Sequence, residues 1–135
     1  MKEKSISKYI LFIDSSADET RIALFQDGEV ITIKKWIGKS DLSETLLIEI
    51  EKLLKNSKVK IKDTGQVAVN QGPGSYTGLR IGMTVANFIA WSLGIPIVTA
   101  NFQDNKLIMG RECKTNNFIL PKYFYPAKIT KAKRK

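Results

Sequence analysis

The chain of 135 residues contains no histidine and a single cysteine, Cys113. Histidine is the commonest metal ligand and general base in proteins, so neither a Ser-His-Asp arrangement nor a Cys-His pair can be assembled from this sequence. One cysteine cannot form a disulfide within the chain, which favours a reducing compartment. We therefore expect no catalytic residues and no metal ligands in this chain.

Long apolar runs are missing as well. No run approaches the roughly 20 residues that span a bilayer. The stretch before Asp14 has a basic start, but its apolar run is short and lacks a small-residue cleavage site, which argues against a secretion signal. The sequence thus predicts one cytoplasmic domain without a membrane segment.

Acidic residues are scarce towards the carboxyl end. The net charge is +9, and the stretch from Arg111 onward carries +7 of it, with Glu112 as its one acid. The last basic residues form a tail next to the aromatic residues 123–125: Lys128, Lys131, Lys133, Arg134 and Lys135. Such a run attracts phosphates, and aromatic rings can stack on bases. A nucleic-acid-binding tail and a solvated terminus are both open interpretations.

The first half of the chain has the pattern of three antiparallel strands and a helix. Tyr9 to Ile13 is a continuous apolar run, typical of a strand covered on both faces. Arg21 to Phe25 and Glu29 to Trp36 follow as strands, joined by the hairpin signal Asp27-Gly28. The leucines and isoleucine on one face of Leu42 to Asn56 predict an amphipathic helix. Asp41 and Glu44 at its start have the spacing of a capping box.

The pattern of the stretch from Val67 to Val98 predicts a strand, a glycine loop, a helix and a second strand, in that order. The helix is expected to begin near Thr77 or Gly78 and to end at Gly94. A row of small residues follows one of its faces at every fourth position: Gly78, Gly82, Ala86 and Ala90. The row either packs on the protein's own sheet or receives a second chain.

The predicted order of elements is three strands, helix, strand, helix, strand. A hairpin meander followed by strand–helix crossovers is the pattern of a single α/β domain of the ribonuclease H-like class, as in one half of the actin and sugar-kinase (ASKHA) proteins. In the mixed and polar stretch that follows, a short helix is expected from Gln103 to Met109, and a last strand from Phe118 to Leu120.

The run GPGSYTGLRIGMTVANFIAWSLGIPIV resembles the signature of the TsaB (YeaZ) family, a bacterial subunit needed to make threonylcarbamoyladenosine in tRNA. The resemblance covers Tyr9 to Ala100 well and the closing segment loosely, where Tyr125 stands in place of an expected arginine. TsaB proteins usually carry a second domain, for which only about twenty residues are available here. The resemblance therefore implies a domain at 1–100, a short remnant at 101–127 and the basic tail at 128–135. The chain is either a miniature that lost its second half or a shortened variant whose partner replaces it.

The same resemblance implies partners. The catalytic paralogue TsaD holds a metal with two histidines on the helix that matches Leu42 to Asn56. This chain has no histidine there. It is therefore expected to be an accessory subunit without catalysis of its own. It would pair with itself and with a TsaD-like subunit through two helices, in a complex that also includes a TsaE-like ATPase, ATP or ADP, and tRNA. The implied interface residues are Leu42, Leu46, Leu47, Ile50, Gly78, Arg80, Gly82, Met83, Ala86 and Ala90.

A remnant nucleotide or anion site is the remaining alternative. Its candidate residues lie in the first turn and the glycine loop: Asp14, Ser15, Gly72, Gly74, Ser75 and Thr77. Backbone N–H groups at a helix start suit phosphate, but the loop lacks the lysine of a GxxxxGKS motif. The glycines are equally well explained by close packing of strand, loop and helix. Asp14 is equally well explained as a solvated turn residue.

Overall fold

The computed structural model describes residues 8–38, 41–74, 76–113 and 119. They form one six-stranded mixed sheet with the strand order β3-β2-β1-β4-β5-β6. The strands are β1 (Tyr9–Asp14), β2 (Glu19–Gln26), β3 (Glu29–Ile37), β4 (Thr64–Val69), β5 (Ile97–Gln103) and β6 (Lys106–Cys113). The helices are α1 (Leu42–Asn56), the short 3₁₀ helix η1 (Ile61–Asp63) and α2 (Tyr76–Leu93). None of the described helices is long and apolar enough to cross a membrane.

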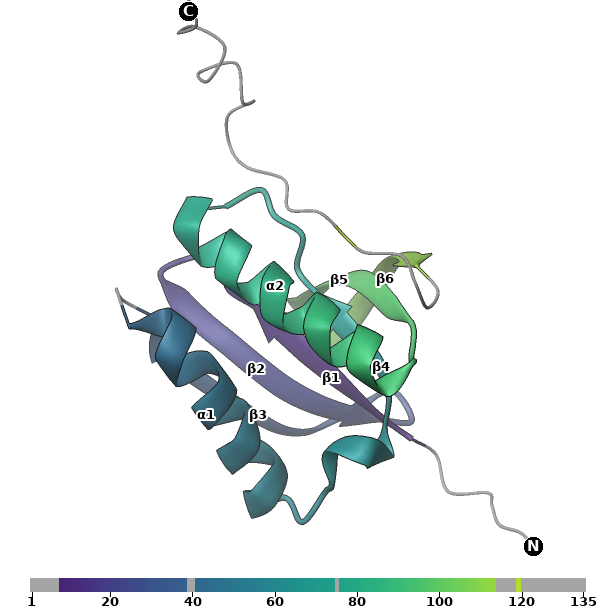
Figure 1. The fold of residues 1–135 in the computed structure, drawn as a ribbon. Helices are drawn as coiled ribbons and strands as arrows, with labels where there is room; N and C mark the ends of the chain where they lie inside the picture. The colour runs from purple at the N-terminus through teal and green to yellow at the C-terminus, as the bar shows by residue number, and fades with distance from the viewer. Residues whose placement is uncertain (1–7, 39–40, 75, 114–118, 120–135) are drawn as a thin grey trace, which may run out of the picture.

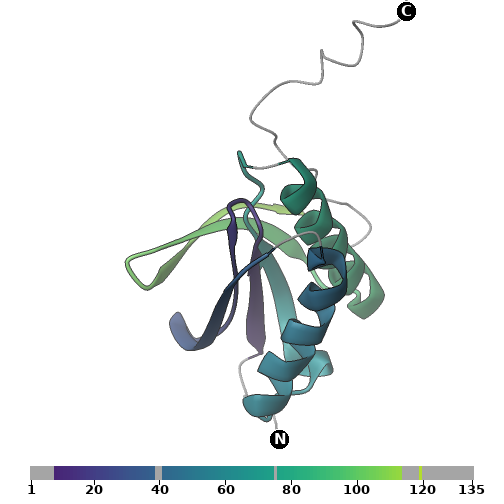
Figure 2. The ribbon, with the colours of Figure 1, turned by 90° about the vertical axis from the view of Figure 1, so that its left-hand side faces the viewer.

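The predicted meander and crossovers are confirmed. The strands β1, β2 and β3 pair antiparallel, whereas β4 lies parallel to both β1 and β5. Figures 1 and 2 show α1 and α2 side by side on one face of the sheet, as two crossovers of the same hand require. Asp27 and Gly28 both have positive φ, which fits the two-residue hairpin turn expected there.

The stretch after β5 differs from the prediction. The segment expected to form a helix from Gln103 to Met109 instead forms the antiparallel hairpin of β5 and β6, which turns at Asp104 and Asn105. Both turn residues have positive φ, the conformation of a two-residue hairpin turn, and Asp and Asn tolerate it better than most residues. The expected boundary after Ala100 falls inside β5. The expected strand from Phe118 to Leu120 lies outside the described residues except for Ile119.

The sheet separates two apolar clusters. The larger lies under the helices and contains the buried face of α1 together with Met83, Ala86, Ile89 and Ala90 of α2. The smaller lies on the opposite face, where Phe102 of β5 contacts Phe12 of β1 and Phe25 of β2 with ring centroids 6.1 and 5.5 Å apart. Residues from β2 and β5 meet because the sheet curls strongly away from the helices, as Figure 2 shows.

The start of α1 lacks one predicted detail. Asp41 occupies the N-cap position, but its side chain makes no capping hydrogen bond, so the capping box with Glu44 is not formed. Instead, the backbone N–H groups of Glu44 and Thr45 donate to the carbonyl oxygen of Asp41.

Candidate functional site

The polar residues of the first turn gather where β1 and β4 end. Asp14 is the last residue of β1 and is almost fully buried, as is Ser15. Asn70 follows β4, and its side-chain amide donates to Asp14 Oδ2 at 3.3 Å. The carboxyl ends of these parallel strands bring together residues that are 56 positions apart.

Both carboxylate oxygens of Asp14 accept hydrogen bonds from other groups of the protein. Its Oδ1 accepts hydrogen bonds from the N–H and the hydroxyl of Ser16, at 2.9 and 2.6 Å. Its Oδ2 accepts from Arg21 at 2.6 Å, in an ion pair across the β1–β2 hairpin. The expectation of a solvated turn at Asp14 is therefore wrong. Asp18 and Glu19, by contrast, are exposed.

The environment of Asp14 keeps its carboxyl group ionised. Burial raises the pKa, but the hydrogen bonds from Ser16 and Arg21 and the charge of Arg21 outweigh it, so the pKa lies below the ordinary value of 3.8. A general base works best when its pKa is near the working pH. This carboxylate is thus suited to holding the turn together rather than to accepting a proton.

The glycines of the loop and helix bring backbones into contact. A Cβ on Gly74 would lie 2.2 Å from the carbonyl oxygen of Ser16, and one on Gly82 would lie 1.9 Å from the hydroxyl oxygen of Ser15. That hydroxyl donates to the carbonyl oxygen of Gly78 in the first turn of α2, at 2.6 Å. Close packing of strand, loop and helix therefore accounts for Gly74 and Gly82.

The candidate anion-binding residues are only partly brought together. Asp14, Ser15 and Gly74 are in one cluster, and Gly72, with φ of 105°, donates its N–H to Asn70 Oδ1 at 2.9 Å. Thr77 lies exposed in the first turn of α2, and Ser75 lies outside the described residues. Arg21 and Asn70 belong to the cluster but were not among the predicted residues. The hairpin register, which pairs Asp14 with Arg21, is the sequence signal for the first of them.

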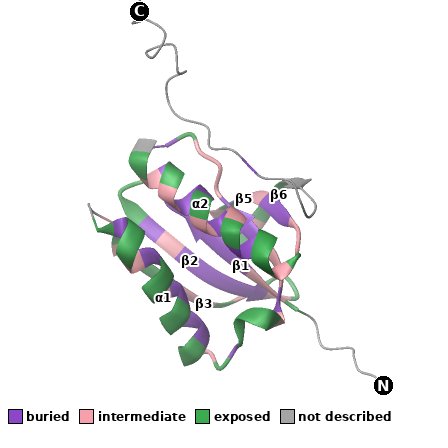
Figure 3. Ribbon diagram, in the orientation of Figure 1, coloured by how far each residue is buried: buried purple, intermediate pink, exposed green. Residues whose placement is uncertain are grey.

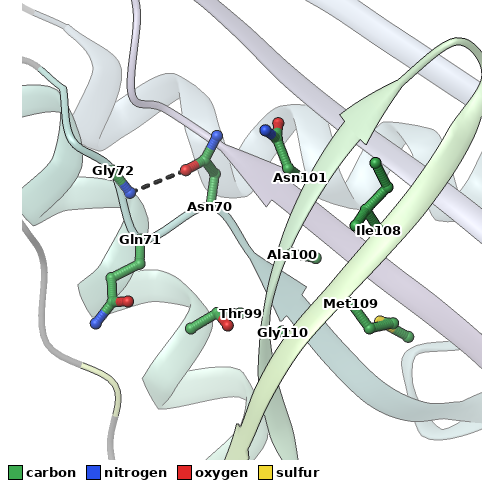
Figure 4. Close-up of a pocket in the computed structure, with 9 residues that line it drawn as sticks. All are labelled: Asn70, Gln71, Gly72, Thr99, Ala100, Asn101, Ile108, Met109 and Gly110. Carbon is green, nitrogen blue, oxygen red and sulfur yellow. Dashed lines mark hydrogen bonds between the residues drawn. The ribbon is translucent and has the colours of Figure 1, made fainter.

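A hollow of about 250 Å³ opens beside this cluster. Figure 4 shows it between the loop from Asn70 to Gly72 and the paired strands β5 and β6, which contribute Thr99 and Asn101 and, farther from the loop, Ile108 and Met109. Its lining residues carry no charge. Among the described residues, no three His, Cys, Asp or Glu side chains gather closely enough to hold a metal ion.

Most of the predicted interface residues lie in the protein's own core. The buried ones are Leu42, Leu46, Ile50, Gly82, Met83, Ala86 and Ala90. The small-residue row faces the sheet, because Gly82 lies against Ser15 and the two alanines join the larger apolar cluster. This corrects the interpretation of the row as a surface. Of the predicted set, Leu47 and Arg80 are exposed and Gly78 is half-buried.

Exposed residues, coloured green in Figure 3, lie on the outer faces of the two helices, and several of them are apolar. Phe88 and Trp91 of α2 are 59 and 57% exposed, and their rings lie 6.4 Å apart. Leu47 and Ile48 of α1 are about half exposed. The spacing of Phe88 and Trp91 by three residues could have identified this pair from the sequence. The expected basic tail lies outside the described residues.

The meander, the two crossovers and the turn at the end of β1 define an α/β domain of the ribonuclease H-like, ASKHA class. A family model described as TsaD, tRNA N6-adenosine threonylcarbamoyltransferase, matches residues 37–108, over half of the chain. The chain belongs to this family, and its resemblance to TsaB (YeaZ) proteins is confirmed by the relatives that follow.

The relatives carry two names. A tRNA threonylcarbamoyladenosine biosynthesis protein TsaB from Bacillus subtilis is 36% identical over 102 residues, which are 76% of this chain and 44% of the relative. A TsaB from Buchnera aphidicola (Schizaphis graminum) is 35% identical over 68% of this chain and 43% of the relative. A tRNA N6-adenosine threonylcarbamoyltransferase from Geotalea uraniireducens is 30% identical over 73% of this chain and 34% of the relative. The chain thus spans less than half the length of these relatives.

A solved structure confirms the fold. YeaZ from Pseudomonas aeruginosa superposes with a TM-score of 0.64 at 19% sequence identity, over 80% of this chain and 67% of that one.

Proposed function

We propose that this chain is a TsaB-like accessory subunit in the synthesis of N6-threonylcarbamoyladenosine at adenosine 37 of tRNA. The observation that carries the proposal is the match of the whole crossover region to the TsaD family model, together with relatives named TsaB at 35 and 36% identity. Because the chain spans less than half of those relatives, the activity of the full-length proteins is extended to it as a hypothesis.

The transfer reaction itself is assigned to a TsaD-like partner. This chain has no histidine, and the buried carboxylate of its first turn is committed to Ser16, Arg21 and Asn70. Catalytic use of this carboxylate would require breaking these contacts. ATP or ADP and a TsaE-like ATPase are proposed to act in the assembled complex rather than on this chain alone.

The docking surface is proposed to be the outer face of α1 and α2. Exposed apolar side chains on adjacent helices are typical of protein interfaces, and aromatic residues contribute most of the binding free energy at such sites. Leu47 of α1 and Phe88 and Trp91 of α2 supply them here. The same face is proposed to pair two copies of the chain when the partner is absent, in the cytoplasm.

Size-exclusion chromatography with light scattering, at micromolar concentrations, tests the proposal. The purified chain and its cognate TsaD-like protein are expected to elute together at the mass of a complex. Two separate species would reject the subunit role. Transfer activity of the chain alone on tRNA would reject the assignment of catalysis to the partner.

A further inference from the structure

Five exposed lysines gather where α1 ends. Residues 52–62 hold no acidic residue and include Lys52, Lys55, Lys58, Lys60 and Lys62. These lysines follow one another through the last turns of α1, the loop after it and η1. Lys8 approaches them from the start of β1, because its ammonium donates to the carbonyl oxygen of Lys62 at 3.4 Å. Figures 1 and 2 show that this end of α1 and the start of β1 lie at the same end of the molecule. The five residues form a lysine surface there.

The fold does not favour a lysine at position 58. The helix α1 ends in a Schellman motif, in which the N–H of Val59 donates to the carbonyl oxygen of Leu54 at 2.9 Å. The N–H of Lys58 donates to the carbonyl oxygen of Lys55 at 3.1 Å in the same motif. The motif places Lys58 at φ of 59°, the left-handed conformation that glycine usually supplies. A side chain at this position costs stability, so the charge of Lys58 is the better explanation for its presence.

The dipole of α1 accounts for only part of the lysine surface. A cation in the last turn of a helix is stabilised by the partial negative charge of the free carbonyl groups, which fits Lys55. The effect falls off within one turn, so Lys60 and Lys62, which lie at η1, gain nothing from it. Like charges this close together also repel one another, and a bound polyanion would relieve that repulsion.

A hollow of about 210 Å³ lies beside the lysine surface, between β3 and α1. Lys52 lines it from the helix and Lys34 from the strand. Glu49 is the acidic residue of the lining, and its Oε1 lies 3.2 Å from Lys34 Nζ. Two lysines against one glutamate leave the lining with a net charge of +1. Since a water molecule takes about 30 Å³ of liquid volume, the hollow has room for a phosphate group. Asn56 adds a side-chain amide that can donate to a phosphate oxygen.

We propose that the lysine surface binds RNA, with one backbone phosphate seated in the hollow beside Lys52. The inference rests on the proposed function in taking RNA as the polyanion, because that function concerns tRNA. A protein partner fits the surface less well, since lysine is depleted at protein–protein interfaces, where aromatic residues and arginine are enriched. Lysines that contact phosphates position a nucleic acid without reading its bases, so RNA is bound by its backbone rather than by its sequence.

Neutralising two lysines of the surface tests the proposal. The ligand is a tRNA transcript labelled for fluorescence anisotropy, which is titrated with the full chain at several salt concentrations. In the double variant Lys52→Gln and Lys55→Gln, affinity near about 0.1 M salt is expected to fall at least about tenfold. The slope of log affinity against log salt is expected to become smaller by about 2. The basic residues near the carboxyl end of the chain are present in every variant, so they do not contribute to these differences.

The double variant Lys35→Gln and Lys106→Gln is the matched control. It removes the same number of charges from exposed positions outside the lysine surface. Lys35 is not part of the lining of the hollow, and Lys106 lies on β6, at the opposite edge of the sheet from β3. Its RNA affinity is expected to stay within about threefold of the wild type. The single variant Lys52→Gln, with a slope change of about 1, replaces the first double variant if that one does not fold.

Lys58→Gly separates binding from stability. Glycine adopts the φ of 59° more readily than lysine, so Tm is expected to rise by a few degrees. One phosphate contact is lost at the same time, so RNA affinity is expected to fall about three- to tenfold. A lysine that served only the fold would not give this combination of a higher Tm and weaker binding. Unchanged affinity in Lys58→Gly would remove Lys58 from the surface.

Equal RNA affinities of the Lys52 and Lys55 double variant and the control would overturn the proposal. If RNA affinity is unchanged and the complex with a TsaD-like protein is weaker, the surface is a protein contact, which overturns the proposal as well. RNA binding is measured on the chain alone, whereas the light-scattering experiment measures complex formation. Failure of the RNA-binding surface is therefore distinguished from failure of the proposed function.

Discussion

Asp14 Oδ2 and Arg21 Nη2 lie 2.6 Å apart next to the turn of the β1–β2 hairpin, where the register pairs these two residues. The guanidinium of Arg21 also lies 5.5 Å from the centre of the Phe102 ring and donates to the Phe102 carbonyl oxygen at 3.5 Å. Arg21 thus links the first turn to β5, across the curled face of the sheet.

Arg21→Met is expected to destabilise the domain by about 2–3 kcal/mol. Removing one partner of a buried ion pair leaves an uncompensated charge, and the figure is at the low end because the Arg21 side chain is 23% exposed. Urea unfolding at neutral pH measures the loss. Lys34→Met, which removes a more exposed ion pair with Glu49, is the control and should change the free energy of unfolding by less than about 1 kcal/mol. Equal losses in the two variants would contradict the role given to Arg21.

The pH dependence of stability should follow Asp14. Because its pKa is lower in the folded protein than the ordinary value of 3.8, the unfolded chain binds the proton more tightly. The stabilisation is therefore complete above about pH 5 and is lost as the pH falls below 4 towards the folded pKa. Unfolding free energies measured from pH 7 to pH 3 should fall more steeply in the wild type than in Asp14→Asn. Parallel curves would show that Asp14 does not titrate in this way.

Gly82→Ala is expected to destabilise the domain by about 2–4 kcal/mol, since the added Cβ would overlap the Ser15 hydroxyl. Ser15→Ala alone should cost about 1 kcal/mol, for the hydrogen bond to Gly78. The double variant should be more stable than Gly82→Ala alone, because the overlapping oxygen is gone. A double-mutant cycle from chemical denaturation measures this coupling, and strict additivity would argue against the close approach.

The elements with strong local signals could be predicted from sequence alone. The apolar run of β1, the turn at Asp27-Gly28 and the apolar face of α1 all follow from short-range patterns. The site was predicted only in part, because Asn70 and Arg21 reach Asp14 through strand register rather than through a motif. The contact of Asn87 with Ile119 has no local signal at all, since it joins residues 32 positions apart.

The small-residue row shows where a pattern is ambiguous. A stripe of glycine and alanine indicates close approach, but it does not say whether a sheet or another chain approaches. The contact of Gly82 with Ser15 shows that the group approaching the stripe is the protein's own first turn. The hairpin of β5 and β6 was missed because the apolar residues of β6, Leu107, Ile108 and Met109, are consecutive and lack the alternation of a half-buried strand. Its one local signal was the pair Asp104-Asn105, which resembles the turn at Asp27-Gly28.

Asn105→Gly should stabilise the domain by about 0.5–1 kcal/mol. Asn105 has φ of 62°, which glycine adopts without the steric penalty of a Cβ. Thermal unfolding should show a rise in Tm of a few degrees. Asn101→Gly, at an exposed position within β5, is the control and should lower Tm, because glycine weakens a strand. A lower Tm for Asn105→Gly would show that the Asn105 side chain contributes more than its backbone strain costs.

The docking face can be tested without disturbing the fold. Phe88→Ala and Trp91→Ala should each weaken binding to a TsaD-like partner at least tenfold, because exposed aromatic residues at an interface commonly contribute 2 kcal/mol or more. Since both side chains are more than half exposed in the monomer, Tm should change by no more than a few degrees. Ile31→Ala, at an exposed apolar position on β3 rather than on a helix, is the matched control for isothermal titration. If Ile31→Ala weakens binding as much as the helix variants do, the interface lies at the β3 edge of the sheet and not on α1 and α2.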